Sequence, residues 1–175
     1  GVCTKVTVRL LQTPESVRTL LADFLTIEAA GDTVGDIVDA AIIPAAVEMM
    51  DSMAMEAAEA ATGAGLTVDA PAALIIELDG PADEVEAEFS HLTAICERHG
   101  ATRLHVPTEV EERQKVWKGR KAAFAAVGRI SPDYIVQDGV VPRTRLAEVL
   151  TRIAEMGRDA GLRVANVFHA GDGNL

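Results

Sequence analysis

The run Ala-Leu-Ile-Ile-Glu-Leu (73–78) is followed by Asp-Gly, by a longer stretch from Pro81 to Gly100, and by Thr-Arg-Leu-His-Val (102–106). The first and last runs are short and bounded by turn residues, which predicts two strands. The stretch between them begins at a proline, ends at a glycine and predicts a helix. Its apolar stripe consists of Val85, Phe89, Leu92, Cys96 and His99. A strand–helix–strand unit of this kind predicts a sheet with helices packed on it.

The same alternation extends in both directions along the chain. Further strands are predicted over 2–11, 45–50, 134–141 and 163–168. Further helices are predicted from Thr13-Pro14-Glu15 through Phe24, from Gly31-Asp32 to Pro44, from Asp51 to Gly63, from Thr108 to Val127, and over 144–160. The alternation alone favours a parallel sheet, although split βαβ units with antiparallel pairing produce the same order of elements.

Composition narrows the function classes. The chain has 175 residues, which suits one domain or one lobe of a larger protein, and aromatic residues make up only 3%, so the core is aliphatic. A net charge of −11 argues against a nucleic-acid partner and against an anionic membrane surface. The two cysteines, Cys3 and Cys96, are too few for a disulfide framework or a four-cysteine zinc site. No apolar run reaches the ~20 residues of a membrane span.

Both ends of the sequence are unusual. The chain begins with Gly1 rather than Met, and it stops at Leu175 within a glycine-rich turn. We therefore expect both ends to lie inside a longer polypeptide, and no prediction about targeting is made.

The first candidate site is His169-Ala-Gly-Asp-Gly-Asn174, which follows the predicted strand over 163–168. Two glycines beside Asp172 permit a tight turn, and the sheet would hold the imidazole of His169 in place. Imidazole is a good ligand for zinc, iron or manganese. A simple strand–turn with a hydrogen-bonded histidine remains the alternative, because no second ligand is evident from the spacing.

The second candidate is Arg120, on the helix predicted from 108 to 127. At 100° per residue, Arg120 and Arg113 fall within the apolar arc of this helix. The apolar members of that arc are Val116, Trp117, Phe124 and Val127. A guanidinium on such a face suits a carboxylate from the protein or from a ligand, since its planar fork pairs bidentately. An arginine whose stem packs while its head reaches solvent is the alternative, and it is favoured for Arg113.

The third candidate is the segment over 134–143. A strand that ends in Pro-Arg and enters a helix is able to present Asp138 or Arg143. A strand bulge at Asp-Gly followed by a helix start explains the same residues without a function, and is the simpler interpretation.

These segments resemble a known family. The run from Gly119 to Leu146, which contains Gly-Arg-Ile-Ser-Pro-Asp-Tyr (128–134), is similar to the C-terminal domain of FAD-linked oxidases, and so is the segment from Arg163 to Leu175. The run Ile43-Pro-Ala-Ala-Val-Glu-Met-Met-Asp51 also fits the FAD-binding subunit of glycolate oxidase, with the D-lactate and D-2-hydroxyglutarate dehydrogenases as more distant relatives.

The resemblance implies an FAD-dependent oxidation of a small 2-hydroxy acid, glycolate or D-lactate, to the 2-oxo acid. It implies that residues 1–175 are the substrate-side cap domain, that a separate N-terminal domain holds most of the FAD, and that the fragment alone is inactive. The implied fold is α+β, a ferredoxin-like sandwich with a mainly antiparallel sheet, which we prefer to the parallel alternative.

Three residues acquire roles from the resemblance. His169 matches the first metal-binding histidine of a His-x-Gly-Asp-Gly-Asn-x-His motif, and is expected to be catalytic. The second histidine would follow Leu175, and a third ligand, a Glu, would lie further on, so binding of a divalent metal such as zinc is expected to be weak or absent here. Arg120 matches a contact to the substrate carboxylate, and Asn174, with Asp172, is expected to shape the turn that faces the substrate.

Other substrate contacts of the relatives fall on Phe124 and Val136, whose apolar side chains favour a small acid over 2-hydroxyglutarate. We expect a cytoplasmic protein without a transmembrane segment, associated with membranes only through partner oxidase subunits, and able to form a homodimer. A non-catalytic ligand-binding or dimerisation module, in which Arg120 pairs with an internal Glu and His169 is structural, is the second hypothesis.

Overall fold

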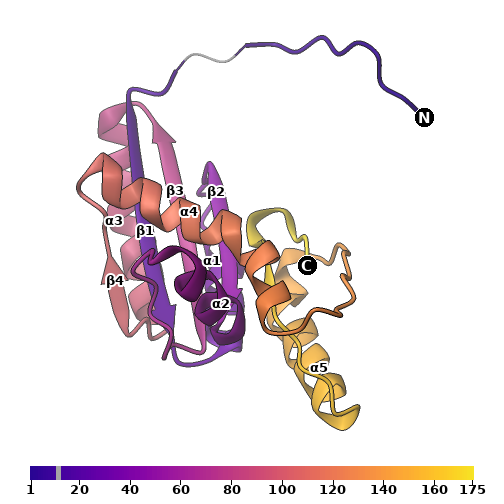
Figure 1. Cartoon of the computed structure of the whole chain (residues 1–175). Helices are drawn as coiled ribbons and strands as arrows, with labels where there is room; N and C mark the ends of the chain where they lie inside the picture. The colour runs from indigo at the N-terminus through magenta and orange to yellow at the C-terminus, as the bar shows by residue number, and fades with distance from the viewer. Residues whose placement is uncertain (11–12) are drawn as a thin grey trace.

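An antiparallel sheet forms the centre of the computed structural model, which describes residues 1–10 and 13–175 (Figure 1). The strands are β1 (Ser16–Phe24), β2 (Ala46–Asp51), β3 (Ala72–Gly80), β4 (Arg103–His105) and β5 (Val167–His169). The helices are α1 (Ile27–Asp39), α2 (Ser52–Thr62), α3 (Ala82–Arg98), α4 (Val110–Ala126) and α5 (Leu146–Asp159). Short 3₁₀ turns η1 (Val127–Arg129), η2 (Arg143–Arg145) and η3 (Ala170–Asp172) connect them.

The strands lie in the order β4-β1-β3-β2-β5, and every neighbouring pair is antiparallel. The order of β4, β1, β3 and β2, with α1 and α3 as the crossover helices, is the ferredoxin-like split βαβ arrangement. Helix α2 is inserted between β2 and β3, and β5 extends the sheet beyond β2. The α+β prediction is confirmed, and the parallel alternative is wrong.

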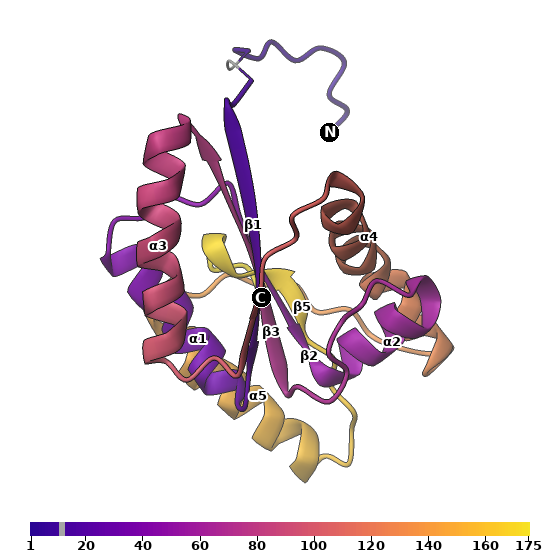
Figure 2. The ribbon, with the colours of Figure 1, turned by 90° about the vertical axis from the view of Figure 1, so that its left-hand side faces the viewer.

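Helices cover both faces of the sheet, which Figure 2 shows nearly edge-on. Helices α1, α3 and α5 contribute to one apolar cluster with side chains such as Leu20, Leu74 and Met49. Helices α2 and α4 contribute to a second cluster with Leu21, Ile75 and neighbouring residues. Because side chains alternate along each strand, the central strands are apolar on both faces.

Strand β1 lies where the sequence predicts a helix, and this prediction is wrong. The residues Val17, Leu20, Leu21 and Phe24 have helical spacing, but they fall on a central strand that is buried on both faces. A two-sided burial pattern produces a continuous apolar run, which periodicity cannot separate from a helix. Pairing with β3 over all nine residues of β1 then decides for the strand.

Two predicted strands are wrong, and a third is shorter than predicted. Residues 1–10 form no strand and are exposed, and Leu11 of that prediction lies outside the described residues. Residues 134–141 form only an isolated bridge, Val140 to Asn174. The last strand covers only Val167–His169 of the region predicted from 163. A strand needs a neighbouring strand for its backbone hydrogen bonds, and the propensity of a segment does not provide one.

The start of α2 follows the prediction. Asp51 Oδ1 accepts a hydrogen bond of 2.9 Å from the backbone N–H of Ala54 and so caps the helix. Its other oxygen accepts hydrogen bonds from the backbone and the side chain of Asn166, at 2.6 and 2.8 Å. Asp51 therefore ties α2 to the segment that leads into β5.

No helix in the described part of the chain is long and apolar enough to cross a membrane.

Candidate functional site

A buried glutamate, Glu48, lies at the centre of the candidate site. It stands on β2, opposite His169 of β5 and Ile75 of β3 in the register of the sheet. Its side chain is on the face that α2 and α4 cover and is 5% exposed. A carboxylate buried to this degree requires charged or hydrogen-bonding partners.

Arg120 of α4 provides the first partner. Its Nε and Nη2 atoms donate to Glu48 Oε2 at 3.0 and 2.7 Å, and its side chain is only 13% exposed. A guanidinium has five N–H donors, so these bonds leave three, two on Nη1 and one on Nη2. That free edge has the geometry for a bidentate contact with a second carboxylate.

His169 provides the second partner. Its Nδ1 atom lies 2.5 Å from Glu48 Oε1, and its side chain is 63% exposed. Among the described residues, no hydrogen bond is made by the Nε2 atom on the opposite side of the ring. The imidazole is therefore held at one nitrogen and open at the other.

The structure brings together the two strongest candidates from the sequence, Arg120 and His169, which are 49 positions apart. Glu48, the residue that joins them, was not among the candidates predicted from the sequence. Glu48 is an acidic residue within an otherwise apolar strand, and this is the signal from which it could have been found. Two N–H groups of Arg120 are thus already bonded to a carboxylate of the protein. This internal pairing is the contact that the hypothesis of a non-catalytic module predicts.

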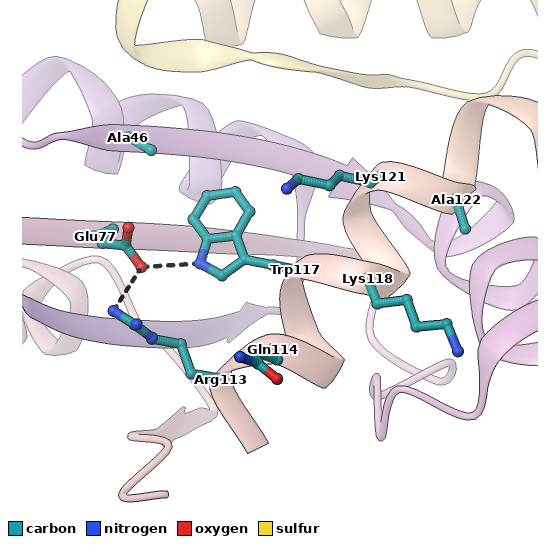
Figure 3. A pocket seen from close by; sticks show the side chains of 8 residues that line it. All are labelled: Ala46, Glu77, Arg113, Gln114, Trp117, Lys118, Lys121 and Ala122. Carbon is teal, nitrogen blue, oxygen red and sulfur yellow. Dashed lines mark hydrogen bonds and ion pairs between the residues drawn. The ribbon is translucent and has the colours of Figure 1, made fainter. Parts of the chain in front are cut away.

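A second carboxylate, Glu77 of β3, lies beneath the earlier turns of α4 (Figure 3). Its Oε2 atom accepts hydrogen bonds from Trp117 Nε1 at 2.8 Å and from the hydroxyl of Thr19 at 2.7 Å, and lies 3.9 Å from Arg113 Nη1. Arg113 thus reaches the carboxylate of a protein residue, which differs from the solvent-directed head favoured for it. An open hollow of about 790 Å³ lies beside the indole, with Lys118 and Lys121 along its rim.

The apolar face of α4 differs from the predicted one. Its buried residues are Val116, Gly119, Ala123 and Ala126. Phe124, predicted to be buried, is 51% exposed and packs edge-on against Tyr134 with ring centroids 6.4 Å apart. The small residues Gly119 and Ala123 allow α4 to approach α2 closely, and this contact rotates Phe124 outward.

The glycine-rich turn after β5 pairs with the third candidate segment. The Nδ2 atom of Asn174 donates to Asp138 Oδ1 at 2.6 Å and to the carbonyl of Gly139 at 3.3 Å. Gly173 has φ +72°, and a Cβ there would lie 2.2 Å from the carbonyl oxygen of Val141, so only glycine fits. The amide N–H groups of Asn174 are engaged, which leaves its Oδ1 atom for any ligand.

Arg143 contacts the same glycine-rich turn. Its Nη1 atom donates to the carbonyl of Gly171 at 3.1 Å. A cavity of about 660 Å³ lies between the start of β2, the end of α1 and this turn. Its polar lining consists of Glu48, Trp117, Arg143, His169 and Asp172.

Within residues 1–10 and 13–175, the side chains form no complete metal site, and the turn after β5 is not shaped to hold a phosphate group. No group of three or more histidine, cysteine, aspartate or glutamate side chains that could hold a metal occurs in 1–10 and 13–175. The turn over 171–173 does not form a phosphate cradle either, because the N–H of Gly173 bonds to the carbonyl of Ala170 and Val141 packs against the turn. No chemical step is therefore assigned to a metal ion or to a flavin within this domain.

Fold and site together define a ferredoxin-like domain that presents a guanidinium and an imidazole on one buried carboxylate. The family model described as "FAD linked oxidases, C-terminal domain" matches residues 13–175. The chain belongs to this family, as the resemblance in the sequence predicts.

Similar proteins agree with the family. The "Glycolate oxidase subunit GlcD" of Escherichia coli (strain K12) is 49% identical over 175 residues, which is all of this chain and 35% of that protein. The protein of the same name from Bacillus subtilis (strain 168) is 35% identical over all of this chain and 37% of its own length. The "D-lactate dehydrogenase [cytochrome], mitochondrial" of Arabidopsis thaliana is 28% identical, over all of this chain and 31% of its length. The chain thus spans about a third of the length of these curated relatives.

A solved structure supports the fold. The structure titled "alkyldihydroxyacetonephosphate synthase in P1" superimposes with a TM-score of 0.67 over 93% of this chain and 35% of that chain. The sequence identity is 14%, so this likeness concerns the fold alone.

Proposed function

We propose that this chain is the substrate-side domain of an FAD-dependent dehydrogenase that converts a small 2-hydroxy acid, glycolate or D-lactate, to the 2-oxo acid. Membership of the FAD-linked oxidase family and the names of the similar proteins support the reaction class. The FAD would be held mainly by the remainder of the protein, as membership of the FAD-linked oxidase family and the resemblance to it imply.

One observation carries the assignment of the site: the free edge of Arg120 and the free Nε2 of His169 are fixed on the two oxygens of the same glutamate. The guanidinium would bind the substrate carboxylate, and the imidazole would face the substrate hydroxyl, which is attached to the adjacent carbon. A 2-hydroxy acid carries these two groups on neighbouring atoms, so neighbouring receptors on the protein match it.

Two positions at which the family resemblance implies substrate contacts, Phe124 and Val136, carry apolar side chains, which supports a small substrate. Phe124 lies one helical turn after Arg120, and both Phe124 and Val136 are 51% exposed. Neither side chain is able to hydrogen-bond a second carboxylate, whereas both tolerate the hydrogen or methyl group of glycolate or lactate. The proposed role of Asn174 is to shape the turn and to offer its Oδ1 atom as an acceptor.

A non-catalytic binding or dimerisation module is the second candidate. The pairing of Arg120 with an internal glutamate favours it, since the positive charge of the guanidinium is already compensated. The two candidates differ in what the full-length protein does. A catalyst is yellow from bound flavin and oxidises a 2-hydroxy acid, and a module does neither.

The test is a screen of 2-hydroxy acids with the purified full-length protein and an artificial electron acceptor. We expect reduction of the acceptor with glycolate or D-lactate, and much slower reduction with 2-hydroxyglutarate. Primary alcohols of similar size serve as controls that lack the carboxylate. A flavin-loaded protein that reduces the acceptor with none of these acids would refute the proposal.

Partner oxidase subunits are part of the proposal, because the similar Escherichia coli protein is named as a subunit of glycolate oxidase. The homodimer and the cytoplasmic location stay predictions.

A further inference from the structure

We propose that Glu48 is a positioning residue that sets both the orientation of Arg120 and the tautomer of His169. The inference takes its substrate from the proposed function, but its geometry is independent of it. Glu48 was not among the residues that the sequence or the family resemblance singled out.

The imidazole of His169 lies against one oxygen of Glu48. Nδ1 of His169 lies 2.5 Å from Glu48 Oε1, which is a hydrogen-bond distance to a carboxylate that has no proton of its own to donate. In the neutral ring the proton is therefore on Nδ1, and Nε2 carries the lone pair. The side chain of His169 is 63% exposed, and Nε2 makes no hydrogen bond among the described residues, so its lone pair is available to a ligand.

The guanidinium of Arg120 lies against the other oxygen of Glu48. Both bonds from Arg120 go to the other oxygen of the same carboxylate, so one side chain fixes the rotation of two groups. Removal of the carboxylate would release both groups together. The buried guanidinium, 13% exposed, would also lose the counter-charge that compensates its burial.

Positioning of Arg120 and His169 by Glu48 can be distinguished from the attachment of α4 to the sheet. Helix α4 is held to the sheet by two carboxylates, Glu48 through Arg120 and Glu77 through Trp117. Glu77 contacts neither His169 nor Arg120 among the described residues. The variant Glu77→Gln therefore weakens the attachment of α4 without changing the positioning contacts, and is a matched control.

The experiment measures Glu48→Gln and Glu77→Gln in the full-length flavoprotein. For Glu48→Gln we expect kcat/KM for the 2-hydroxy acid to fall at least tenfold, with changes in both kcat and KM, because one amide cannot accept from both partners. Glu77→Gln is expected to stay within about threefold of the wild type.

A second measurement does not depend on activity. Nitrogen-15 spectra of histidine-labelled protein report which ring nitrogen carries the proton, and the signals of His169 are assigned by their loss in His169→Asn. We expect the Nδ1–H tautomer in the wild type and in Glu77→Gln, and a mixture of tautomers in Glu48→Gln. If Glu48→Gln does not fold, Glu48→Asp keeps the charge but withdraws the carboxylate by one methylene, and the same mixture is expected.

An unchanged His169 spectrum in the Glu48 variant that folds, or equal kinetic losses in Glu48→Gln and Glu77→Gln, would overturn the inference. If the spectrum changes as expected but the protein oxidises no 2-hydroxy acid, the proposed function fails while the positioning of His169 by Glu48 stands.

Discussion

Two buried aspartates outside the Glu48 site connect the stability of the domain to pH. Burial raises the pKa of Asp51, although the Ala54 and Asn166 hydrogen bonds act in the opposite direction. Burial also raises the pKa of Asp23, which is 1% exposed on β1, and this effect exceeds the lowering by the nearby Thr67 hydroxyl. In the described part of the chain neither carboxylate oxygen has a hydrogen-bond partner of good geometry. The nearest cation to Asp23 is Arg103, 3.8 Å away on β4.

Replacement of Asp23 by Asn is expected to make the folded state less sensitive to pH. A carboxyl group with a raised folded pKa binds more protons in the folded state, so stability falls as pH rises from the usual value of 3.8 through the folded pKa. The free energy of unfolding of Asp23→Asn should therefore match the wild type at low pH, exceed it increasingly as pH rises from 3.8 through the folded pKa, and exceed it by a constant amount at higher pH. Urea unfolding followed by the fluorescence of the single tryptophan, Trp117, measures this difference.

The variant Asp79→Asn, at an exposed position on β3, is the control for removal of a carboxylate from the same sheet without a change in a buried group. A difference between Asp23→Asn and the wild type that stays constant at all pH values would contradict the explanation, since attraction to Arg103 and to His105 would then balance the effect of burial.

At the scale of elements, the packing of α4 on α2 determines where Arg120 is placed. Gly119 is buried in this contact, and a Cβ added there would lie 2.7 Å from the Cβ of Ala64 and 3.3 Å from Leu66 Cδ1. Such a distance requires α4 to move away from the segment that follows α2. The position next to Arg120 in the sequence is therefore constrained by that segment, not by the site itself.

Gly119→Ala is expected to destabilise the domain by about 1–3 kcal/mol, because overpacking exceeds the gain of up to ~1 kcal/mol in helix propensity. Gly35→Ala in α1 is the matched control, since no atom lies within 4 Å of its added Cβ. That variant should be neutral or stabilised by up to ~1 kcal/mol. Urea midpoints measure both, and a stabilised Gly119→Ala would show that α4 and α2 are less closely packed than described.

Some helices and strands could be predicted from the sequence, and others could not. Elements with caps and one buried face were predicted well, such as α2 after Asp51 and α3 between Pro81 and Gly100. Strand β1 was mistaken for a helix, because burial on two faces removes the alternation that identifies a strand. Residues 134–141 have strand composition, but their pairing depends on the turn at the C-terminal end of the chain.

At the scale of the whole molecule, the site forms where three segments that are distant in the sequence meet: β2, α4 and β5. Local patterns identified Arg120 and His169, since each is a polar residue with an unusual neighbourhood in the sequence. The contact of both with Glu48 depends on the strand order β3-β2-β5 and on the face that α4 covers. Neither is encoded in any single segment, so the sequence predicted the members of the site but not the residue that joins them.

The central claim is that the free edge of Arg120 binds a substrate carboxylate, and a comparison of substrates tests it most directly. The measurement is kcat/KM of full-length wild type and Arg120→Ala with glycolate and with glycolamide, which replaces the carboxylate by a neutral amide. A lost charged hydrogen-bonding contact of ~2–3 kcal/mol corresponds to a factor of about 30–150. We predict that Arg120→Ala loses this factor on glycolate, mainly through a higher KM, and changes little on glycolamide. Equal losses on both substrates, or an unchanged KM for glycolate, would contradict the claim.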